Sequence, residues 1–289
     1  MGNPDPPLDD AEAARLKRDV AAKWAAKSGA WARWADTMAE IADRFNQPLL
    51  DAAEVDPGHR VLDLASGVGE PALSAARRVA PEGHVTATDL VPPMLSALAV
   101  RVADAGIANL ETRLADMEAL PFADASFDRV TCRFGIMFSP RPERAMGEAR
   151  RVLRPGGRAA FLVWGPVEDN TLFHVVHGVI GELIASTPFS AHLTPFRYGE
   201  PGSLAAVMRA GGFAGVEERS IHFAPRPPAE LRFWQQNVEM SLGSTYDTLP
   251  AATREAMEAE IARRFAPYRD GDGFQLAAHV RLASGRAPG

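Results

Sequence analysis

The chain has 289 residues, of which 46% are hydrophobic, and its formal net charge is −6. This length suffices for one large domain or one domain with an added cap, and the acidic balance disfavours nucleic acid as a partner because polyanion binding needs clustered cations. No uncharged apolar run reaches the roughly 18 residues of a membrane span, and the single cysteine excludes an intrachain disulfide. With no secretory signal pattern and no zinc-like Cys/His spacing, we expect a metal-free cytoplasmic protein, monomeric or homodimeric, that acts on a small molecule.

The N-terminal part of the chain predicts helices after a short lead. Residues 1–9 are Pro-rich and acidic, and we expect a disordered lead there. Residues 10–55 carry few helix breakers and predict a helical lid. Breaks in its helices are expected near Ser28 and Gly29 and again at Pro48.

Strand and helix signals alternate from residue 56 to residue 166. Strands are predicted at 60–65, 84–88, 110–114, 127–132 and 158–164, and helices at 71–80, 92–105 and about 141–153. Such alternation implies right-handed βαβ crossovers. The fold class is therefore α/β, with a Rossmann-like, mostly parallel sheet and helices on both faces.

The pattern changes after this core. Residues 167–200 are helix-like and rich in aromatic and histidine side chains, which predicts an inserted helical cap. Residues 201–289 are expected to complete the core, with a helix at 203–210, a strand at 216–223 and further helices at about 229–242 and 251–265. The last apolar stretch, 274–285, can add an edge strand whose direction the pattern leaves open.

The stretch VLDLASGVGEPA, residues 61–72, fits two nucleotide-binding patterns. From Gly67 it spells G-x-G-x-x-A, with Asp89 about 20 residues on, as in the dinucleotide fingerprint. From Asp63 it spells D-x-A-x-G-x-G. Asp63 and Glu70 place negative charge where a pyrophosphate would lie. A cationic ligand without phosphate, such as S-adenosylmethionine, is therefore favoured over a nicotinamide dinucleotide.

Such a ligand would use this loop and the next strand in three ways. Gly67 and Gly69 would let the backbone approach it closely, and Asp63 would answer its ammonium group directly or through water. Asp89 would take both ribose hydroxyls through its two oxygens. Asp89 alone would more often be a helix N-cap, but its position at the carboxyl end of a strand favours ribose binding.

Four spaced motifs resemble those of the class I S-adenosylmethionine-dependent methyltransferases, and among them the ubiquinone/menaquinone-biosynthesis type. The motifs are VLDLASGVGE from Val61, VTATDLVPPML from Val85, ADMEALPFADASFDRV from Ala115 and RVLRPGGRAAFLVWG from Arg151. Ala65 stands where the first motif usually has glycine. The resemblance spans roughly residues 53–223 and implies S-adenosyl-L-methionine as the cofactor, with the N-terminal lid closing over it.

The resemblance also implies roles for single residues. Leu90 would pack against the adenine, Asp116 would bond the adenine amino group, and Met117 would flank the ring. Arg133 and Phe134 follow the fourth strand, in the stretch that lines the methyl-transfer pocket of the family. The full expected cofactor site is Asp63, Ala65, Gly67, Gly69, Asp89, Leu90, Asp116, Met117 and Arg133.

The acceptor side is less specified by the sequence. His174 and His177 lie three apart on a predicted cap helix and are the candidate catalytic bases, although nothing pairs either with an orienting carboxylate. The expected substrate pocket comprises Phe134, His192, Phe196 and Tyr198. The stretch CRFGIM after the fourth strand lacks the N/D-P-P-Y/F motif of amino-methylation of nucleic-acid bases.

These features together predict methyl transfer to oxygen or carbon of a small hydrophobic or aromatic metabolite. Two alternatives stay open. One is a methyltransferase-like protein that catalyses a non-methylation reaction, such as a cyclisation, or only binds the cofactor. The other, which the charges of the loop disfavour, is an NAD(P)-dependent oxidoreductase.

Overall fold

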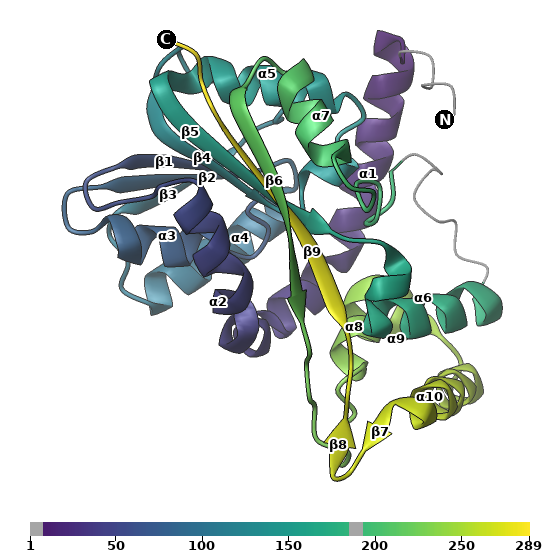
Figure 1. The fold of residues 1–289 in the computed structure, drawn as a ribbon. Helices are drawn as coiled ribbons and strands as arrows, with labels where there is room; N and C mark the ends of the chain where they lie inside the picture. The colour runs from purple at the N-terminus through teal and green to yellow at the C-terminus, as the bar shows by residue number, and fades with distance from the viewer. Residues whose placement is uncertain (1–7, 185–192) are drawn as a thin grey trace.

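A seven-stranded sheet forms the centre of the protein (Figure 1). The structure is a computed structural model that describes residues 8–184 and 193–289. The strand order is β3-β2-β1-β4-β5-β9-β6. The strands are β1 (Arg60–Leu64), β2 (His84–Asp89), β3 (Leu110–Leu114), β4 (Phe127–Arg133), β5 (Leu153–Trp164), β6 (Ala214–Phe223) and β9 (Ala278–Arg286). The strands from β3 to β5 are mutually parallel, as predicted, so the α/β fold class is confirmed.

Helices cover both faces of the sheet because successive strand residues point to opposite sides. On one face, Val61 packs in a core with α2 (Ala35–Ala52), α3 (Ala72–Val79) and α4 (Pro92–Asp104). On the other face, Leu62 packs in a core with α5 (Pro142–Val152) and α7 (Ser203–Ala210). The interior strands β1 and β2 are buried along most of their length. Strands covered on both sides carry continuous apolar runs, and the predicted ranges of these two strands agree with the observed ones to within one residue.

The expected helix breaks in the N-terminal segment are wrong. The first helix, α1 (Asp10–Arg33), continues through Ser28 and Gly29, and α2 contains Pro48. The Ser28 hydroxyl donates to a backbone carbonyl of the preceding turn. The turn after Pro48 is held by Leu49 and Leu50, which are fully buried against the sheet. Packing therefore overrides the low helix propensity of these residues.

The last apolar stretch is an interior strand, so the edge-strand expectation is wrong. Strand β9 lies between β5 and β6 and is antiparallel to both. Residues 279–285 are all buried. A strand that is covered on both faces and paired on both sides satisfies its backbone groups without solvent, and this accounts for the apolar character of the segment.

A second group of helices packs beyond the carboxyl ends of the strands, at the lower right of Figure 1. It contains α6 (Thr171–Leu183), α8 (Gln235–Leu242), α9 (Ser244–Thr248) and α10 (Ala251–Phe265), with the short hairpin β7 (Arg269–Asp270) and β8 (Gly273–Phe274). Three 3-10 turns complete the described elements: η1 (Ile136–Phe138), η2 (Val167–Asp169) and η3 (Ala266–Tyr268). These helices share an apolar core of their own. The predicted helix at 229–242 begins only at Gln235, and the predicted cap is helical over 171–183 among its described residues.

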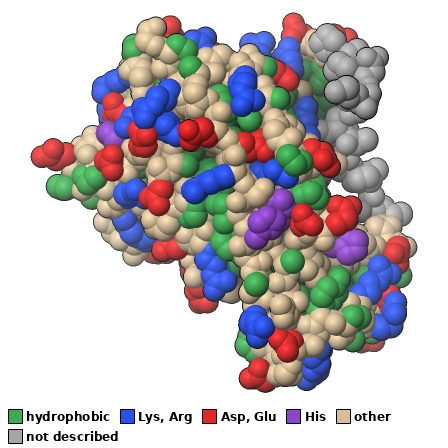
Figure 2. All heavy atoms as spheres, in the orientation of Figure 1, with side chains coloured by type: hydrophobic (Ala, Val, Ile, Leu, Met, Phe, Trp, Pro, Cys, Tyr) green, Lys and Arg blue, Asp and Glu red, His purple; other side chains and the backbone are tan. Residues whose placement is uncertain are grey.

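The surface is mixed in charge. On the face shown in Figure 2, acidic and basic side chains are interspersed. Among the helices of the described ranges, none combines the length and the apolar character that crossing a bilayer requires.

Candidate cofactor and acceptor site

The predicted cofactor residues gather where the strand order reverses. The neighbours of β1 are β2 and β4, so the connections after these strands diverge and open a crevice at their carboxyl ends, the usual ligand site of such sheets. The loop after β1 is built on left-handed backbone, with φ of +53° at Ala65 and Gly67 and +126° at Gly69. Residues with a side chain rarely adopt the φ of Gly69, so the backbone at this position favours glycine.

Asp89 connects the glycine loop after β1 to the start of α4 through hydrogen bonds. Its Oδ2 accepts a hydrogen bond from the Gly67 amide at 2.9 Å, and its Oδ1 accepts one from the Val91 amide at 2.9 Å. Burial raises the pKa of the carboxyl, and the backbone hydrogen bonds oppose that shift. The N-cap of α4 is Val91, without a side-chain cap. Since each carboxylate oxygen can accept two hydrogen bonds, both oxygens of Asp89 keep capacity for a ligand.

Asp63 is fully buried, and one of its two carboxylate oxygens has no hydrogen-bond partner among the described residues. Its Oδ1 accepts a hydrogen bond from the Thr131 hydroxyl at 2.7 Å, whereas its Oδ2 has no partner among the described residues. Burial raises the pKa of this carboxyl from 3.8 to about 7. An unpartnered buried oxygen is costly, and a cationic group brought next to it would relieve that cost. This feature fits the ammonium of S-adenosylmethionine.

A buried amide on α2 connects Glu70 to Arg133. The fully buried Asn46 donates through Nδ2 to Glu70 at 2.7 Å and to Ser74 at 2.9 Å, and its Oδ1 accepts from Arg133 at 3.0 Å. Burial lowers the pKa of the Arg133 guanidinium, and the nearby carboxylates of Glu70 and Asp63 oppose this. Arg133 is thus turned towards α2, in contact with a residue that the sequence analysis missed. The available signal was an amide on the buried face of an amphipathic helix.

Helix α1, which belongs to the predicted lid, reaches the predicted adenine-binding acid. Lys17 Nζ lies 2.5 Å from Asp116 Oδ2 and 2.9 Å from Glu118 Oε2. The other oxygen of Asp116 accepts a hydrogen bond from the Glu118 amide at 2.9 Å. Both oxygens of Asp116 are therefore engaged, and the second missed residue, Lys17, holds one of them. Beside this loop, Met117 packs on the core and Leu90 is half-buried.

Two tryptophans of α1 lie over the same crevice. Trp24 makes edge contacts with Trp31 and with Phe138, at centroid distances of 5.6 and 5.2 Å. Trp31 packs with Val68 of the glycine loop and Val91 at the start of α4. The lid is thus in direct contact with both strand ends that form the crevice.

Aromatic side chains form a continuous wall beside the crevice. Phe134 and Trp164, which lie at the ends of β4 and β5, are stacked with centroids 4.2 Å apart and planes 3° apart. Trp164 continues to Phe173 on α6 at 4.7 Å, and Phe173 continues to Phe196 at 5.7 Å. Phe45 on α2 contacts both stacked rings. We call these five residues the aromatic wall. Phe134 has φ of +57°, a strained conformation that is typical of functional sites.

The structure divides the remaining predicted acceptor-side residues. His177 contacts the aromatic wall through Phe196, at a centroid distance of 6.2 Å, whereas His174 is exposed. Tyr198 is buried in the core beneath α5 and α7, and its hydroxyl has no partner among the described residues. The structure therefore does not bring His174 or Tyr198 to the aromatic wall, although the sequence predicted both for the acceptor side. His192 lies outside the described residues.

Comparisons with known proteins agree with this geometry. The methyltransferase domain family model matches residues 62–161. A ubiquinone/menaquinone biosynthesis C-methyltransferase from Ralstonia pickettii is 42% identical over 120 residues, which are 40% of this chain and 49% of that relative. The chain thus matches about half the length of this relative. The corresponding enzyme from Methylobacterium nodulans is 36% identical over 173 residues, 56% of this chain and 68% of the relative.

The chain belongs to the class I S-adenosylmethionine-dependent methyltransferases. S-adenosylmethionine is accordingly the cofactor of this methyltransferase-family protein. The nocamycin O-methyltransferase of Saccharothrix syringae is 29% identical over 250 residues, 82% of this chain and 89% of that relative. The solved structure of YcgJ from Bacillus subtilis shares the fold, with a TM-score of 0.55 at 20% identity over 84% of this chain and 98% of the other.

A further solved structure with this fold is the [4+2]-cyclase SpnF, with a TM-score of 0.52 at 20% identity over 85% of this chain and 80% of the other. A protein with this fold can thus be named for a reaction other than methyl transfer. The reaction of this methyltransferase-family protein with its acceptor is therefore set by its own side chains and not by the fold.

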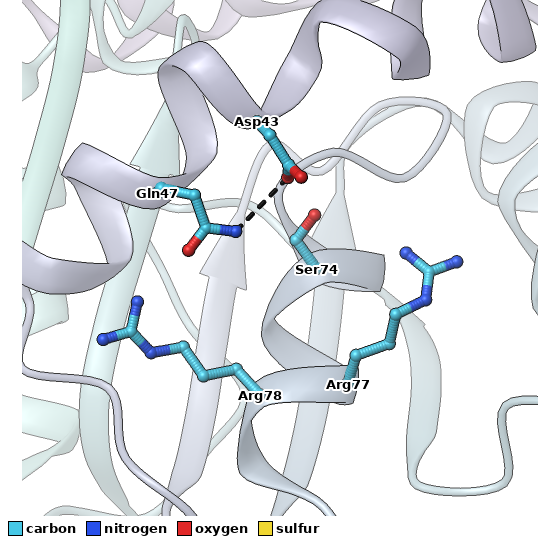
Figure 3. Close-up of a pocket in the computed structure, with 5 residues that line it drawn as sticks. All are labelled: Asp43, Gln47, Ser74, Arg77 and Arg78. Atoms are coloured by element: carbon cyan, nitrogen blue, oxygen red, sulfur yellow. Dashed lines mark hydrogen bonds between the residues drawn. The ribbon is translucent and has the colours of Figure 1, made fainter.

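A separate surface pocket lies between α2 and α3 of the methyltransferase-family chain (Figure 3). It has a volume of about 450 Å³ and is lined by Asp43, Gln47, Ser74, Arg77 and Arg78. Gln47 donates to Asp43, and the two arginines extend in different directions. Arg78 is paired with Asp51 at 2.6 Å. None of the residues predicted for the cofactor or the acceptor lines this pocket.

In the described parts of the chain, no cluster of three or more His, Cys, Asp or Glu side chains suits a metal ion.

Proposed function

We propose that the protein transfers the methyl group of S-adenosylmethionine to an oxygen or carbon atom of a small hydrophobic or aromatic acceptor. The observation that carries this proposal is the stack of Phe134 on Trp164. Phe134 directly follows the strand that borders the cofactor crevice, so the aromatic wall begins at the place where a transferable methyl would be presented. A flat apolar acceptor on that wall would lie next to the cofactor.

Three acids are proposed to hold the cofactor. Asp89 would bind the ribose hydroxyls, Asp63 the ammonium group through its unpartnered oxygen, and Asp116 the adenine amino group. Ala65 and the two loop glycines would bring the backbone close to the ligand, with Leu90 and Met117 beside the adenine. When bound, the cofactor supplies an electrophilic methyl group on a sulfonium centre.

The protein's own contribution to the reaction would be positioning and exclusion of water. The aromatic wall offers a rigid apolar surface that orients the acceptor and removes its hydration shell. His177 contacts this wall, and burial together with the charge of Lys27 lowers its pKa to about 4. It is therefore neutral at pH 7 and would act as a hydrogen-bonding group. Because His174 is exposed, we assign it no catalytic role.

The names of the relatives support both acceptor atoms. The ubiquinone/menaquinone-biosynthesis relatives are C-methyltransferases, and the nocamycin relative is an O-methyltransferase. The nocamycin O-methyltransferase aligns over 82% of this chain, and the Methylobacterium nodulans C-methyltransferase aligns over 56%.

Transfer of a labelled methyl group to a panel of aromatic metabolites tests the proposal. We expect label in at least one phenol or activated aromatic carbon acceptor, with equimolar release of S-adenosylhomocysteine. Binding of S-adenosylmethionine without release, across acceptors that bind to the protein, would instead favour a methyltransferase-like protein that catalyses another reaction. Tight NAD(P) binding without S-adenosylmethionine binding would contradict the cofactor assignment itself.

A further inference from the structure

Helices α6 and α8 pack together and leave one shared flank beside their common core. Val176 of α6 and Val238 and Leu242 of α8 are buried in that core. On each helix, one pair of residues four apart lies to the side of these apolar positions: Phe173 and His177 on α6, and Asn237 and Ser241 on α8. Residues four apart lie one above the other on a helix, so each pair forms a stripe.

A direct contact joins the two stripes. His177 Nε2 lies 3.2 Å from the Ser241 hydroxyl. His177 contacts Phe173 and Phe196 at the far end of the aromatic wall. Through Ser241, the stripe of α8 therefore borders that end of the wall. Asn237 is one turn from Ser241 on that stripe, further along the same border.

Asn237 carries an unused hydrogen-bond acceptor in this border. The residue is only 6% exposed, and its Oδ1 has no donor in the parts of the chain that the structure describes. Leaving a buried amide oxygen without a donor destabilises a protein. Trp234, Val238 and Met240, one to three residues away, are buried apolar side chains. An apolar side chain at residue 237 would serve the core better, so the amide points to a ligand that supplies the donor.

We infer that Asn237 determines acceptor specificity by accepting a hydrogen bond from a hydroxyl group at the end of the acceptor remote from the methyl group. The inference rests on the proposed function, because it takes the aromatic wall as the acceptor surface. The wall runs from the cofactor crevice through Trp164 to Phe173, in steps of 4.2 and 4.7 Å between ring centroids, and Phe173 contacts His177 at 5.3 Å. His177 in turn contacts Ser241, one helical turn from Asn237. The acceptor class is therefore a fused or extended aromatic compound with a second, distal hydroxyl.

The amide suits recognition of that hydroxyl and not its activation. Asn237 has no basic group, so a hydroxyl bound to it keeps its proton and serves as an orienting group. His177 is neutral at pH 7, since burial and the charge of Lys27 lower its pKa to about 4. It can therefore remain hydrogen bonded to Ser241 and hold the neighbouring stripe in place.

Binding of two matched probes tests the inference. The protein, saturated with S-adenosylhomocysteine, is titrated with 2-naphthol and with 2,6-dihydroxynaphthalene in a calorimeter. We expect the wild type to bind the diol roughly five- to tenfold more tightly, as one hydrogen bond to a buried acceptor implies. In Asn237→Leu we expect this preference to vanish while 2-naphthol still binds. Gln236→Leu, on the same helix and a third of a turn away, should keep the preference.

Thermal unfolding of the same variants separates recognition from a structural role. Asn237→Leu should be as stable as the wild type or more stable, because it removes an unpaired buried oxygen. A wild type without preference for the diol, whether it binds both probes or neither, would overturn the inference. Retention of the preference in Asn237→Leu would overturn it as well. Failure of the proposed function is a distinct result, since it appears as a lack of labelled-methyl transfer and leaves the binding preference measurable.

Discussion

The crevice at the ends of β1 and β2 and the aromatic wall at the ends of β4 and β5 are assembled in different ways. The crevice takes its acids from the ends of strands and the loops after them, within one continuous stretch, 61–118. The wall takes single rings from α2, the residue after β4, β5, α6 and a loop at residue 196, which lie up to 151 residues apart. Backbone geometry thus specifies the cofactor side, whereas tertiary packing creates the acceptor side.

The two regions also differ in their polarity. In the crevice, backbone amides and Asn46 donate hydrogen bonds to carboxylates, and Lys17 forms an ion pair with one. Asp63 Oδ2 has no partner among the described residues. In the wall, contacts between rings dominate, and the polar groups stand at its far end. A cationic cofactor and a mostly apolar acceptor are the ligands that such a division accommodates.

Removal of Asp89 should produce the largest effect and should confine it to the crevice. Asp89→Ala deletes the proposed ribose contacts and leaves the Gly67 amide without its partner. We expect S-adenosylhomocysteine affinity to fall by about 1–3 kcal/mol, measured by calorimetry. Asp104→Ala, which removes an exposed acid at the end of α4, should leave affinity unchanged. Unaltered affinity in Asp89→Ala would reduce Asp89 to a loop-stabilising residue.

Removal of the central ring of the wall should affect the acceptor alone. Trp164→Ala eliminates the stack with Phe134 and the contact with Phe173. The loss of this apolar surface should raise the KM for an aromatic acceptor about tenfold, with S-adenosylhomocysteine affinity preserved within about twofold. The control is Tyr198→Phe, which should leave KM unchanged because it keeps the buried ring and removes only the hydroxyl. Equal losses on both ligands would remove the distinction between the two regions.

Cofactor binding should depend on pH because Asp63 is buried in the crevice. Burial raises the pKa of Asp63 to about 7, so the free protein holds a proton there at lower pH. Binding an ammonium next to the carboxyl favours its ionised form and releases that proton. Affinity for S-adenosylhomocysteine should therefore rise from about pH 5 to about pH 7, by at most tenfold per pH unit for one proton.

Asp63→Asn supplies the control for this pH dependence. The amide does not titrate, so the variant should bind with a flatter pH profile. The same carboxyl should make the free energy of unfolding of the ligand-free wild type fall as pH rises from about 4 to about 7, because the folded state holds the proton more tightly than the unfolded chain does. Identical pH profiles for wild type and variant would contradict the proposed role of Asp63.

The smallest effect is expected at the contact between lid and crevice. Lys17 engages Asp116 Oδ2 at 2.5 Å, the acid proposed to bind the adenine amino group. Lys17→Met frees this oxygen, and the gain should be about 0.3–1 kcal/mol in S-adenosylhomocysteine affinity, the scale of a partly exposed ion pair. Arg15→Met, on the same helix and paired only with Asp19 among the described residues, should change nothing. Weaker binding in Lys17→Met would show that the lysine supports the cofactor site.

The same contrast explains which parts of the fold and of the site could be predicted from the sequence. The alternation of apolar runs located every strand of the sheet within a few residues, except that β5 begins at Leu153, and the motifs placed Asp63, Asp89 and Asp116 at neighbouring strand ends. These features depend on local patterns and on the rule that parallel strands share one binding edge.

Contacts between distant segments were beyond its reach. Nothing near Lys17 or Asn46 in the sequence indicates that they meet Asp116 and Arg133, which are 99 and 87 residues away. Periodicity alone also could not separate His174 from His177, since only the packing of α6 leaves His174 exposed and His177 half-buried. The expected break at Pro48 failed for the same reason, because the packing of Leu49 and Leu50 outweighs local propensity.

A structure of the protein with S-adenosylhomocysteine and 2,6-dihydroxynaphthalene tests the two-region assignment most directly. The predicted result has both ribose hydroxyls on Asp89, the naphthalene rings against Trp164 and Phe173, and the distal hydroxyl on Asn237. A cofactor whose ribose does not contact Asp89, or an acceptor bound away from the aromatic wall, would contradict the assignment.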